Sequence, residues 1–302
     1  MKYLKHLTGI YNLSVGQITD ILDETSVQKK LLLSNESIEN LKGKSVLNLF
    51  FENSTRTRLS FERAENLSGL NITNFNPENS SLAKGESIID TIRNIDALKF
   101  DFIISRHPTP GFTNLLLNFT KSQIINAGDG TNEHPTQALL DMFTLREHFG
   151  NLKNKKVCIV GDISHSRVAL SDIFALSKLK ANISVCGPNV FIPRNISSLG
   201  VSVCNDINFA IKNNDALILL RVQLEREAGN SISSLNEYRK FFGINSERLK
   251  LNENIAILHP GPFNKNVELD EDILDLDNLF IFEQVTNGLA VKLALFKLMS
   301  GS

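Results

Sequence analysis

Short apolar runs alternate with amphipathic stretches over the first half of the chain. Four runs of five to seven residues have the length and composition of strands: 45–51, 71–75, 101–105 and 123–127. Apolar residues at helical spacing follow each run, near 55–68, 87–99, 111–119 and 136–148. A strand followed by a helix, repeated in this way, predicts a parallel sheet that is covered on both faces.

The chain predicts a helix before these strands and a second domain after them. Ser14 and Gln17 have the spacing of a capping box, ahead of an apolar helical stripe. The polar stretch 150–156 interrupts the pattern and is the best boundary between domains. A second series of strands is then expected at 157–160, 183–186, 201–204, 216–220, 255–258 and 280–282.

These elements predict an α/β fold with two doubly wound parallel-sheet domains. We expect the first domain to span 1–149 and the second to span 150–285. A last helix, within 286–302, is expected to return to the first domain.

Composition and charge narrow the class of protein. The chain is 42% hydrophobic and 22% charged, as in globular proteins, and 32 basic residues balance 33 acidic ones. No bulk positive field is therefore available for nucleic acid or an anionic membrane, and any anion must be bound locally. No apolar run approaches a membrane span or a signal peptide. Three cysteines without metal-ligand spacing suit a reducing cytoplasm: Cys158, Cys186 and Cys204.

Ligands of open α/β sheets bind beyond the carboxyl ends of the strands, where this chain places arginines. Arg56 and Arg58 fall in the first turn of a predicted helix, where they oppose the helix dipole unless an anion is bound. Arg106 directly follows an apolar strand. The structural alternatives are a simple N-cap at Ser54 or Thr55 with solvated arginines, and a salt bridge for Arg106.

His134 precedes Pro135, which suits the first position of a helix. Ser, Thr, Asp or Asn would ordinarily cap that helix, so an imidazole there indicates a binding role. The positive end of the helix dipole should keep the ring neutral, able to donate a hydrogen bond to a carbonyl oxygen. Gln137 can reach the same ligand, and the alternative is a capping or packed histidine.

The second domain repeats the pattern, with Arg167 in a first helical turn and Arg221 after a strand. Surface salt bridges could explain each arginine singly, but together with Arg56 and Arg106 they predict a cleft between the domains that holds two or more anionic groups. The turn at 161–167 lacks the G-x-G-x-x-G fingerprint of dinucleotide sites. The segment 259–262, His-Pro-Gly-Pro, predicts a stiff loop that offers backbone carbonyls. Locally, 79–86 is only a polar loop before a helix that begins near Ser87.

Seven motifs, in order over nearly the whole chain, resemble those of aspartate carbamoyltransferase catalytic chains: F-F-E-N-S-T-R-T-R (50–58), K-G-E (84–86), R-H-P (106–108), H-P-T-Q (134–137), R-V-Q (221–223), H-P-G-P (259–262) and Q-V-T-N-G (284–288). Ornithine carbamoyltransferases usually carry cysteine in the motifs at 134–137 and 259–262, and neither cysteine is present here.

The resemblance implies a role for each matching position. Phosphate binding falls to Ser54, Thr55, Arg56 and Thr57. The carbonyl oxygen of carbamoyl phosphate is polarised by Thr57, Arg106 and His134. Its amide nitrogen is held by Gln137 and by the loop of Pro260, Gly261 and Pro262. The carboxylates of aspartate are bound by Arg167, Arg221 and Gln223. Two residues reach in from a neighbouring chain of a homotrimer, Ser80 and Lys84, and Lys84 touches both substrates.

The function implied is transfer of the carbamoyl group from carbamoyl phosphate to L-aspartate in pyrimidine biosynthesis. The catalytic set is then Arg56, Thr57, Lys84, Arg106 and His134, which act by orientation and by donors aimed at the oxyanion and the leaving phosphate. Neither metal nor cofactor is expected, nor a nucleic-acid or membrane partner, and the sequence leaves regulatory chains open. The alternatives are another acceptor such as ornithine, a binding protein without turnover, and a nucleotide-binding oxidoreductase.

Overall fold

The computed structural model describes residues 4–36, 38, 41–77, 80, 85–222 and 234–301. The chain divides into two compact units, Met1–Leu140 with Thr286–Ser302, and Asp141–Val285. Two helices, α5 (Pro135–Phe149) and α10 (Ile281–Ser300), each begin in one unit and end in the other. The polar stretch 150–156 connects α5 to the first strand of the second unit.

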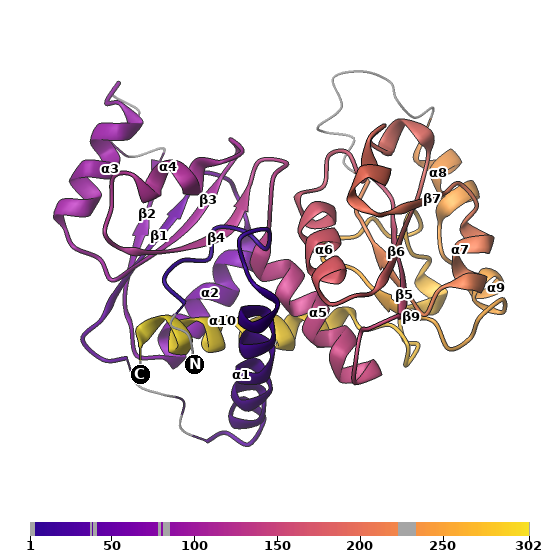
Figure 1. Cartoon of the computed structure of the whole chain (residues 1–302), viewed down its shortest axis with the longest axis horizontal. Helices are drawn as coiled ribbons and strands as arrows, with labels where there is room; N and C mark the ends of the chain where they lie inside the picture. The colour runs from indigo at the N-terminus through magenta and orange to yellow at the C-terminus, as the bar shows by residue number, and fades with distance from the viewer. Residues whose placement is uncertain are drawn as a thin grey trace. The chain divides into compact units, whose positions relative to one another are not determined.

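The first unit contains a four-stranded parallel sheet in the order β2-β1-β3-β4. Its strands are β1 (Ser45–Phe50), β2 (Asn71–Phe75), β3 (Phe102–His107) and β4 (Gln123–Asp129). Its other helices are α1 (Val15–Leu33), α2 (Thr55–Leu67), α3 (Ile88–Ala97) and α4 (Phe112–Leu117). Apolar side chains of α3 and α4 pack on one face of the sheet, and α2 and α10 lie on the other (Figure 1).

The ends of the chain complete this unit. The capping box at Ser14 and Gln17 is confirmed at the start of α1. Leu7 pairs beside β4 by two backbone hydrogen bonds, and so extends the edge of the sheet. In α10 the Phe296 ring packs at 5.5 Å from that of Phe102. The prediction that the last helix returns to the first domain is therefore confirmed.

The second unit contains a five-stranded parallel sheet in the order β7-β6-β5-β8-β9. Its strands are β5 (Lys156–Val160), β6 (Asn182–Cys186), β7 (Ser202–Cys204), β8 (Ala216–Leu219) and β9 (Ala256–Leu258). Its helices are α6 (Arg167–Lys178), α7 (Ile207–Asn213), α8 (Leu235–Phe242) and α9 (Ser246–Leu249). Its described residues also include the short 3-10 turns η3 (Asn189–Phe191), η4 (Ile196–Leu199) and η6 (Glu271–Ile273).

One predicted strand is wrong. Residues 281 and 282 of the run 280–282 open α10, which begins at Ile281, ahead of the range 286–302 expected for the last helix. Ile281 and Gln284 are buried while Phe282 is 77% exposed, which is the spacing of a helix. Phe280 still donates its backbone N–H to Ile257, so the chain touches the sheet edge just before the helix begins. Three apolar residues in a row could not distinguish these two structures.

Within the parts of the chain that are described, no helix is long and apolar enough to cross a membrane.

Candidate active site

The start of α2 forms the first part of the site. Ser54 occupies the N-cap position, but its hydroxyl makes no capping hydrogen bond, and the first turn has no acidic residue. Thr55 and Arg56 are exposed, and Thr57 is half-buried. The initial N–H groups of a helix have no partner within it and favour an anion. The helix start thus has the features of a phosphate site, and a simple Ser54 cap does not explain it.

Arg58, the other arginine of this segment, has a structural explanation. Its Nε lies 3.2 Å from Glu62 Oε1, one turn along α2. Asn74 on β2 donates to the same carboxylate oxygen at 3.1 Å. The ion pair therefore offsets the cost of a cation near the helix start, and no ligand is needed for Arg58.

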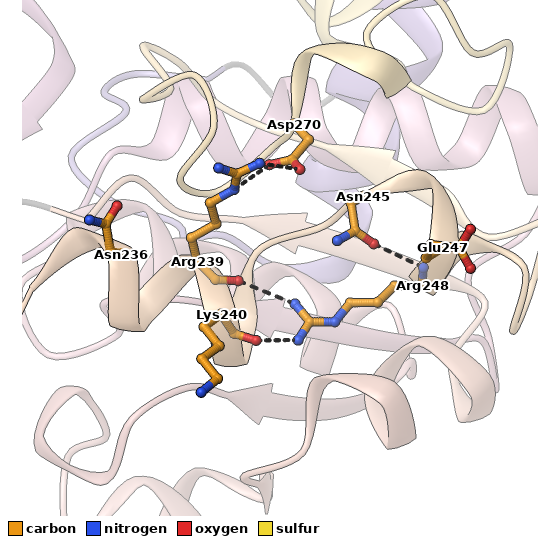
Figure 2. Close-up of a pocket in the computed structure, with 7 residues that line it drawn as sticks. All are labelled: Asn236, Arg239, Lys240, Asn245, Glu247, Arg248 and Asp270. Atoms are coloured by element: carbon orange, nitrogen blue, oxygen red, sulfur yellow. Dashed lines mark hydrogen bonds and ion pairs between the residues drawn. The ribbon is translucent and has the colours of Figure 1, made fainter.

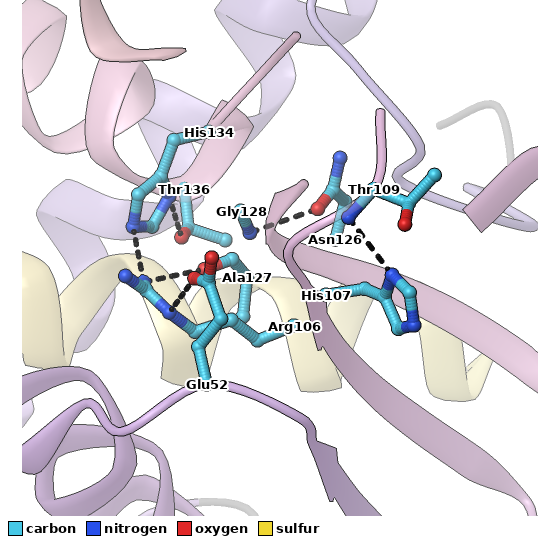
Figure 3. Close-up of polar contacts among 9 residues, drawn as sticks. All are labelled: Glu52, Arg106, His107, Thr109, Asn126, Ala127, Gly128, His134 and Thr136. Carbon is cyan, nitrogen blue, oxygen red and sulfur yellow. Dashed lines mark hydrogen bonds and ion pairs between the residues drawn. The ribbon is translucent and has the colours of Figure 1, made fainter. Parts of the chain in front are cut away.

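Arg106 lies at the carboxyl end of β3, where the register with β4 shifts, and is the register partner of Phe50 at the end of β1. Its Nε donates to Glu52 Oε2 at 3.2 Å and its Nη1 donates to the Ala127 carbonyl at 3.0 Å (Figure 3). Both members of the ion pair are largely shielded, with side chains 14% and 18% exposed. A phosphate that binds Arg106 must therefore compete with Glu52.

His134 lies beside Arg106, immediately before α5. Arg106 Nη1 is 3.5 Å from His134 Nε2, and Thr136 Oγ1 is 3.3 Å from Nδ1 (Figure 3). Because arginine can only donate, Nε2 is assigned as the acceptor, which puts the proton of a neutral ring on Nδ1. This differs from the predicted donor, since a hydrogen bond from Nε2 to a substrate requires the other tautomer. Gln137 is half-buried on the first turn of α5.

The turn before His134 is held by carboxylates. Glu133 Oε2 accepts from the Ile10 backbone at 2.6 Å and its Oε1 accepts from Tyr11 at 3.2 Å. A Cβ added to Gly9 would lie 2.2 Å from Glu133 Oε1, so only glycine leaves room for this carboxylate. Asp129 Oδ1 accepts from the Glu133 backbone at 3.2 Å. The N-terminal segment is therefore fastened to the residue that precedes the imidazole.

His107 supports the end of β3 from the other side. Its ring stacks on Phe112 at 3.8 Å and meets Phe51 edge-on at 4.7 Å. Its Nδ1 accepts from the Thr109 backbone at 2.9 Å (Figure 3). Burial lowers the pKa of His107, which favours the neutral ring that this hydrogen bond requires.

Sequence reasoning gave no role to Glu52 or His107, although both lie within motifs. The available signal for Glu52 was an acidic residue between an apolar strand and two arginines. Of the residues assigned to a neighbouring chain, Ser80 is half-buried and donates to the Pro77 carbonyl at 2.8 Å. Lys84 and Gln223 lie outside the described residues.

The second unit carries the other two arginines at the ends of its strands. Arg167 is the first residue of α6 and only 4% exposed, and the Ser166 hydroxyl caps this helix by accepting from Ala169 at 3.2 Å. Arg221 is half-buried after β8. Before α6, His165 Nδ1 lies 2.9 Å from the buried Asp162 carboxylate. A buried arginine at a helix start fits an anion site better than a solvated surface pair.

The loop 259–262 follows β9, the edge strand of this sheet. His259 is 1% exposed, and its Nδ1 accepts from the Gly261 backbone at 2.8 Å. Gly261 has a φ of +62°, which glycine adopts without the steric cost of a Cβ. Pro260 and Gly261 are half-exposed and Pro262 is exposed. The predicted display of backbone carbonyls is thus compatible with a tightly held loop.

A surface hollow of about 510 Å³ lies elsewhere in the second unit, between α8 and α9 (Figure 2). Its arginines are engaged in holding the helices. Arg239 forms two hydrogen bonds with Asp270, at 2.8 and 3.0 Å. Arg248 donates to the Lys240 carbonyl at 2.6 Å and also to that of Gly243. None of the predicted site residues lines this hollow.

No group of three or more metal-ligating side chains occurs in the described ranges. Separately, the positions described above offer anion binding by arginines and helix starts, with an imidazole at a helix N-terminus.

Two family models match the chain: the carbamoyl-P binding domain of aspartate/ornithine carbamoyltransferase over residues 5–147 and the Asp/Orn binding domain over 153–299. The chain belongs to the aspartate/ornithine carbamoyltransferase family.

The similar curated proteins carry a more specific name. The aspartate carbamoyltransferase catalytic subunit of Caldanaerobacter subterraneus is 48% identical, over 98% of this chain and 97% of that protein. That of Gemmatimonas aurantiaca is 46% identical over 98% and 94%. These names support the aspartate prediction and not the ornithine alternative.

Solved structures of aspartate transcarbamoylases are also similar to this chain. Aspartate transcarbamoylase of Trypanosoma cruzi in complex with N-(phosphonacetyl)-L-aspartic acid has a TM-score of 0.88 at 28% identity, over 97% of this chain and 94% of that one. The catalytic subunit of M. jannaschii aspartate transcarbamoylase has a TM-score of 0.86 at 33% identity, over 99% and 98%.

Proposed function

We propose that this chain transfers the carbamoyl group of carbamoyl phosphate to the amine of L-aspartate. The amine nitrogen forms a bond to the carbamoyl carbon, the bond from that carbon to the phosphate oxygen breaks with its electron pair leaving on phosphate, and the proton lost by the amine passes to the phosphate. The products are N-carbamoyl-L-aspartate and phosphate, and the reaction belongs to pyrimidine biosynthesis. The Trypanosoma cruzi relative is described in complex with carbamoyl phosphate and aspartate together, which supports this pair of substrates.

The observation that carries the proposal is the contact between Arg106 and His134 at the carboxyl end of β3. Arg106 is also the register partner of Phe50, which ends the strand that leads into α2. Donors for a phosphate and for a carbonyl oxygen therefore come from neighbouring strands of one sheet. We assign the phosphate to Ser54, Thr55, Arg56 and Thr57, and the carbonyl oxygen to Thr57, Arg106 and His134.

The mechanism requires rearrangement at Arg106. When the anion binds, the guanidinium exchanges Glu52 for phosphate oxygens, which match its fork of donors. His134 Nε2 then loses the donor that faces it in this structure and can carry the proton itself. In that tautomer Nε2–H stabilises the oxyanion as the tetrahedral intermediate forms.

The remaining roles follow the same assignment. In the second unit, Arg167, Arg221 and Gln223 bind the carboxylates of aspartate. Gln137 and the loop of Pro260, Gly261 and Pro262 hold the amide nitrogen of carbamoyl phosphate. We also propose a cytoplasmic location, which suits the free thiols of Cys158, Cys186 and Cys204.

The test compares the two substrates in arginine variants of the full chain. Arg167→Leu and Arg221→Leu should each raise KM for aspartate roughly 10- to 100-fold, as loss of charge-assisted hydrogen bonds does. Carbamoyl phosphate affinity, measured by direct binding, should change far less. Arg58→Leu is the matched control because its partner is Glu62, and it should leave both values near wild type. Equal losses for the two substrates, or activity with ornithine in place of aspartate, would overturn the assignment.

We further propose a homotrimer in which Ser80 and Lys84 serve the site of a neighbouring chain. Lys84→Ala and Arg106→Ala should each be inactive alone. When the two are dissociated and reassembled together, some sites receive Lys84 from one chain and Arg106 from the other, so activity should return. Hybrids that remain inactive would show that Lys84 does not act across chains.

A further inference from the structure

A buried hydrogen-bonded chain in the second unit connects α5, α10 and the end of β9. Gln284, in the first turn of α10, is 3% exposed. Its Nε2 donates to Asp141 Oδ1 at 2.6 Å, and its Oε1 accepts from the His259 backbone at 2.9 Å. A backbone N–H can only donate and an ionised carboxylate can only accept, so both contacts fix the same orientation of the amide. The short contact to Asp141 is that of a charge-assisted hydrogen bond.

These hydrogen bonds hold the loop 259–262, which the sheet does not hold by itself. β9 is an edge strand, and in the described chain its outer side is bridged at Ile257 by Leu279 but not at the residues that follow Leu258. The His259 N–H is instead satisfied by Gln284, and the His259 ring in turn accepts from Gly261. Asp141 therefore reaches Gly261 through three successive hydrogen bonds. The direction of the carbonyls in this loop depends on buried groups that lie outside it.

A second buried carboxyl interacts with Asp141. Asp172 on α6 is fully buried, and neither of its oxygens makes a hydrogen bond within the described ranges. Burial, with the charge of Asp141 as the lesser cause, raises the pKa of Asp172 well above its usual value. Two carboxyls buried together do not both ionise. The raised pKa of Asp172 favours its protonated form, while Asp141 Oδ1 accepts the hydrogen bond that orients Gln284.

We propose that Gln284 and Asp141 are positioning residues for the carbamoyl-binding loop 259–262. This inference rests on the proposed function, which assigns the carbonyls of that loop to the amide nitrogen of carbamoyl phosphate. The amide N–H groups must stay in place while the carbamoyl carbon becomes tetrahedral. A displacement of the loop by about 1 Å can cost on the order of 100-fold in rate. The two residues therefore act on turnover without touching the substrate.

The test exchanges the amide and the carboxylate. Gln284→Glu alone places a third carboxyl beside Asp141 and Asp172, and should lower kcat roughly 10- to 100-fold. The double variant Asp141→Asn with Gln284→Glu restores both hydrogen bonds described for position 284. In it the new amide at position 141 donates to the new carboxylate at position 284, which still accepts from the His259 N–H. It should recover most of the lost kcat. Val285→Thr, at an exposed position of the same helix, is the control and should have wild-type activity.

Two further readouts separate positioning from general destabilisation. Gln284→Met, which keeps the volume but removes both hydrogen bonds, should raise KM for carbamoyl phosphate more than KM for aspartate. Hydrogen exchange in residues 256–264 of the substrate-free chain should become faster in Gln284→Met and return to normal in the double variant. If Gln284→Met does not fold, the kcat values of Gln284→Glu and of the double variant decide whether Gln284 positions the loop.

Several results would overturn the proposal: wild-type kcat in a folded Gln284→Met or in Gln284→Glu, a double variant no better than Gln284→Glu, or unchanged exchange in 256–264. The exchange measurement needs no turnover, so it distinguishes failure of this inference from failure of the proposed function. If the wild-type chain forms no carbamoyl-aspartate but exchange responds as expected, the hydrogen-bonded chain is correct and the assigned reaction is wrong.

Discussion

Glu65 should make the first unit less stable as the pH rises through neutrality. This side chain lies on α2 and is fully buried against β1. Its Oε2 accepts from Asn48 Nδ2 at 2.9 Å, whereas Glu65 Oε1 and Asn48 Oδ1 make no hydrogen bond within the described chain. A protonated carboxyl would offer a donor as well as an acceptor, which is what the two groups of the Asn48 amide require. Burial raises the pKa of Glu65 to about 7.

The size of the effect follows from linkage. A raised pKa means that the folded state binds the proton more tightly than the unfolded chain, so the stabilisation is complete at low pH and is lost as the pH rises. The pKa moves from 4.5 to about 7, and each pKa unit corresponds to about 1.4 kcal/mol. The free energy of unfolding should therefore fall by about 3 kcal/mol as the pH rises from below 4.5 to above 7.

Glu65→Gln tests this reasoning because glutamine has the shape and the donor and acceptor of the protonated acid at every pH. The variant should exceed the stability of wild type by about 1 kcal/mol near pH 5, where the unfolded chain has already lost most of this proton, and by about 3 kcal/mol near pH 8. Urea unfolding followed by circular dichroism suits this chain, which has no tryptophan. Glu62→Gln, which removes a partly exposed carboxylate of the same helix, is the control and should not reproduce the trend. A difference between Glu65→Gln and wild type that stays constant from pH 5 to 8 would refute the account.

Three further changes have defined outcomes. Lys292 is buried over the Phe61 ring at 5.0 Å, and burial lowers its pKa to about 7, so the folded chain should gain stability as the pH rises from 7 toward 10.5. Lys292→Met should therefore stabilise the chain most near pH 6. Urea unfolding that shows no stabilisation at that pH would contradict this prediction. His134→Ala should lower kcat roughly 100- to 1,000-fold with a smaller change in KM, and an unchanged kcat in steady-state assays would exclude the oxyanion role. Glu52→Gln removes the carboxylate that pairs with Arg106, and loss of this ion pair, worth about 1 kcal/mol, should tighten the binding of inorganic phosphate about fivefold. Weaker binding in calorimetry would argue against competition between Glu52 and phosphate for Arg106.

The alternation of strands and helices could be predicted because most of the strand runs are apolar and the helices that follow them carry apolar residues at helical spacing. The exception at 280–282 shows the limit, since three apolar residues have no period and the burial of Gln284 inside α10 has no local signal. Residues after the strands could be identified as candidate ligand-binding residues because an arginine in the first turn of a helix is destabilising unless an anion is bound there. Arg106 and His134 could be chosen as candidates from residue type and position, and their roles in the reaction stay a prediction.

Contacts between residues that are distant in the sequence could not be predicted in the same way. Glu52 meets Arg106 across 54 positions, through the pairing of β1 with β3. Asp141 meets Gln284 across 143 positions. The tautomer of His134 depends on which side chain faces Nε2, a property of the folded site rather than of the motif. Local patterns indicate which residues can do chemistry, while packing determines what holds them.

The central claim is the bond that the chain makes, and isotope labels test it directly. Carbamoyl phosphate labelled with ¹³C at the carbonyl and aspartate labelled with ¹⁵N are incubated with the purified chain, and the product is followed by NMR. The account predicts a carbonyl signal split by a directly bonded ¹⁵N, appearing with one equivalent of phosphate, and no such product when ornithine replaces aspartate. Release of phosphate without the ¹³C–¹⁵N bond, or formation of the bond with ornithine alone, would contradict it.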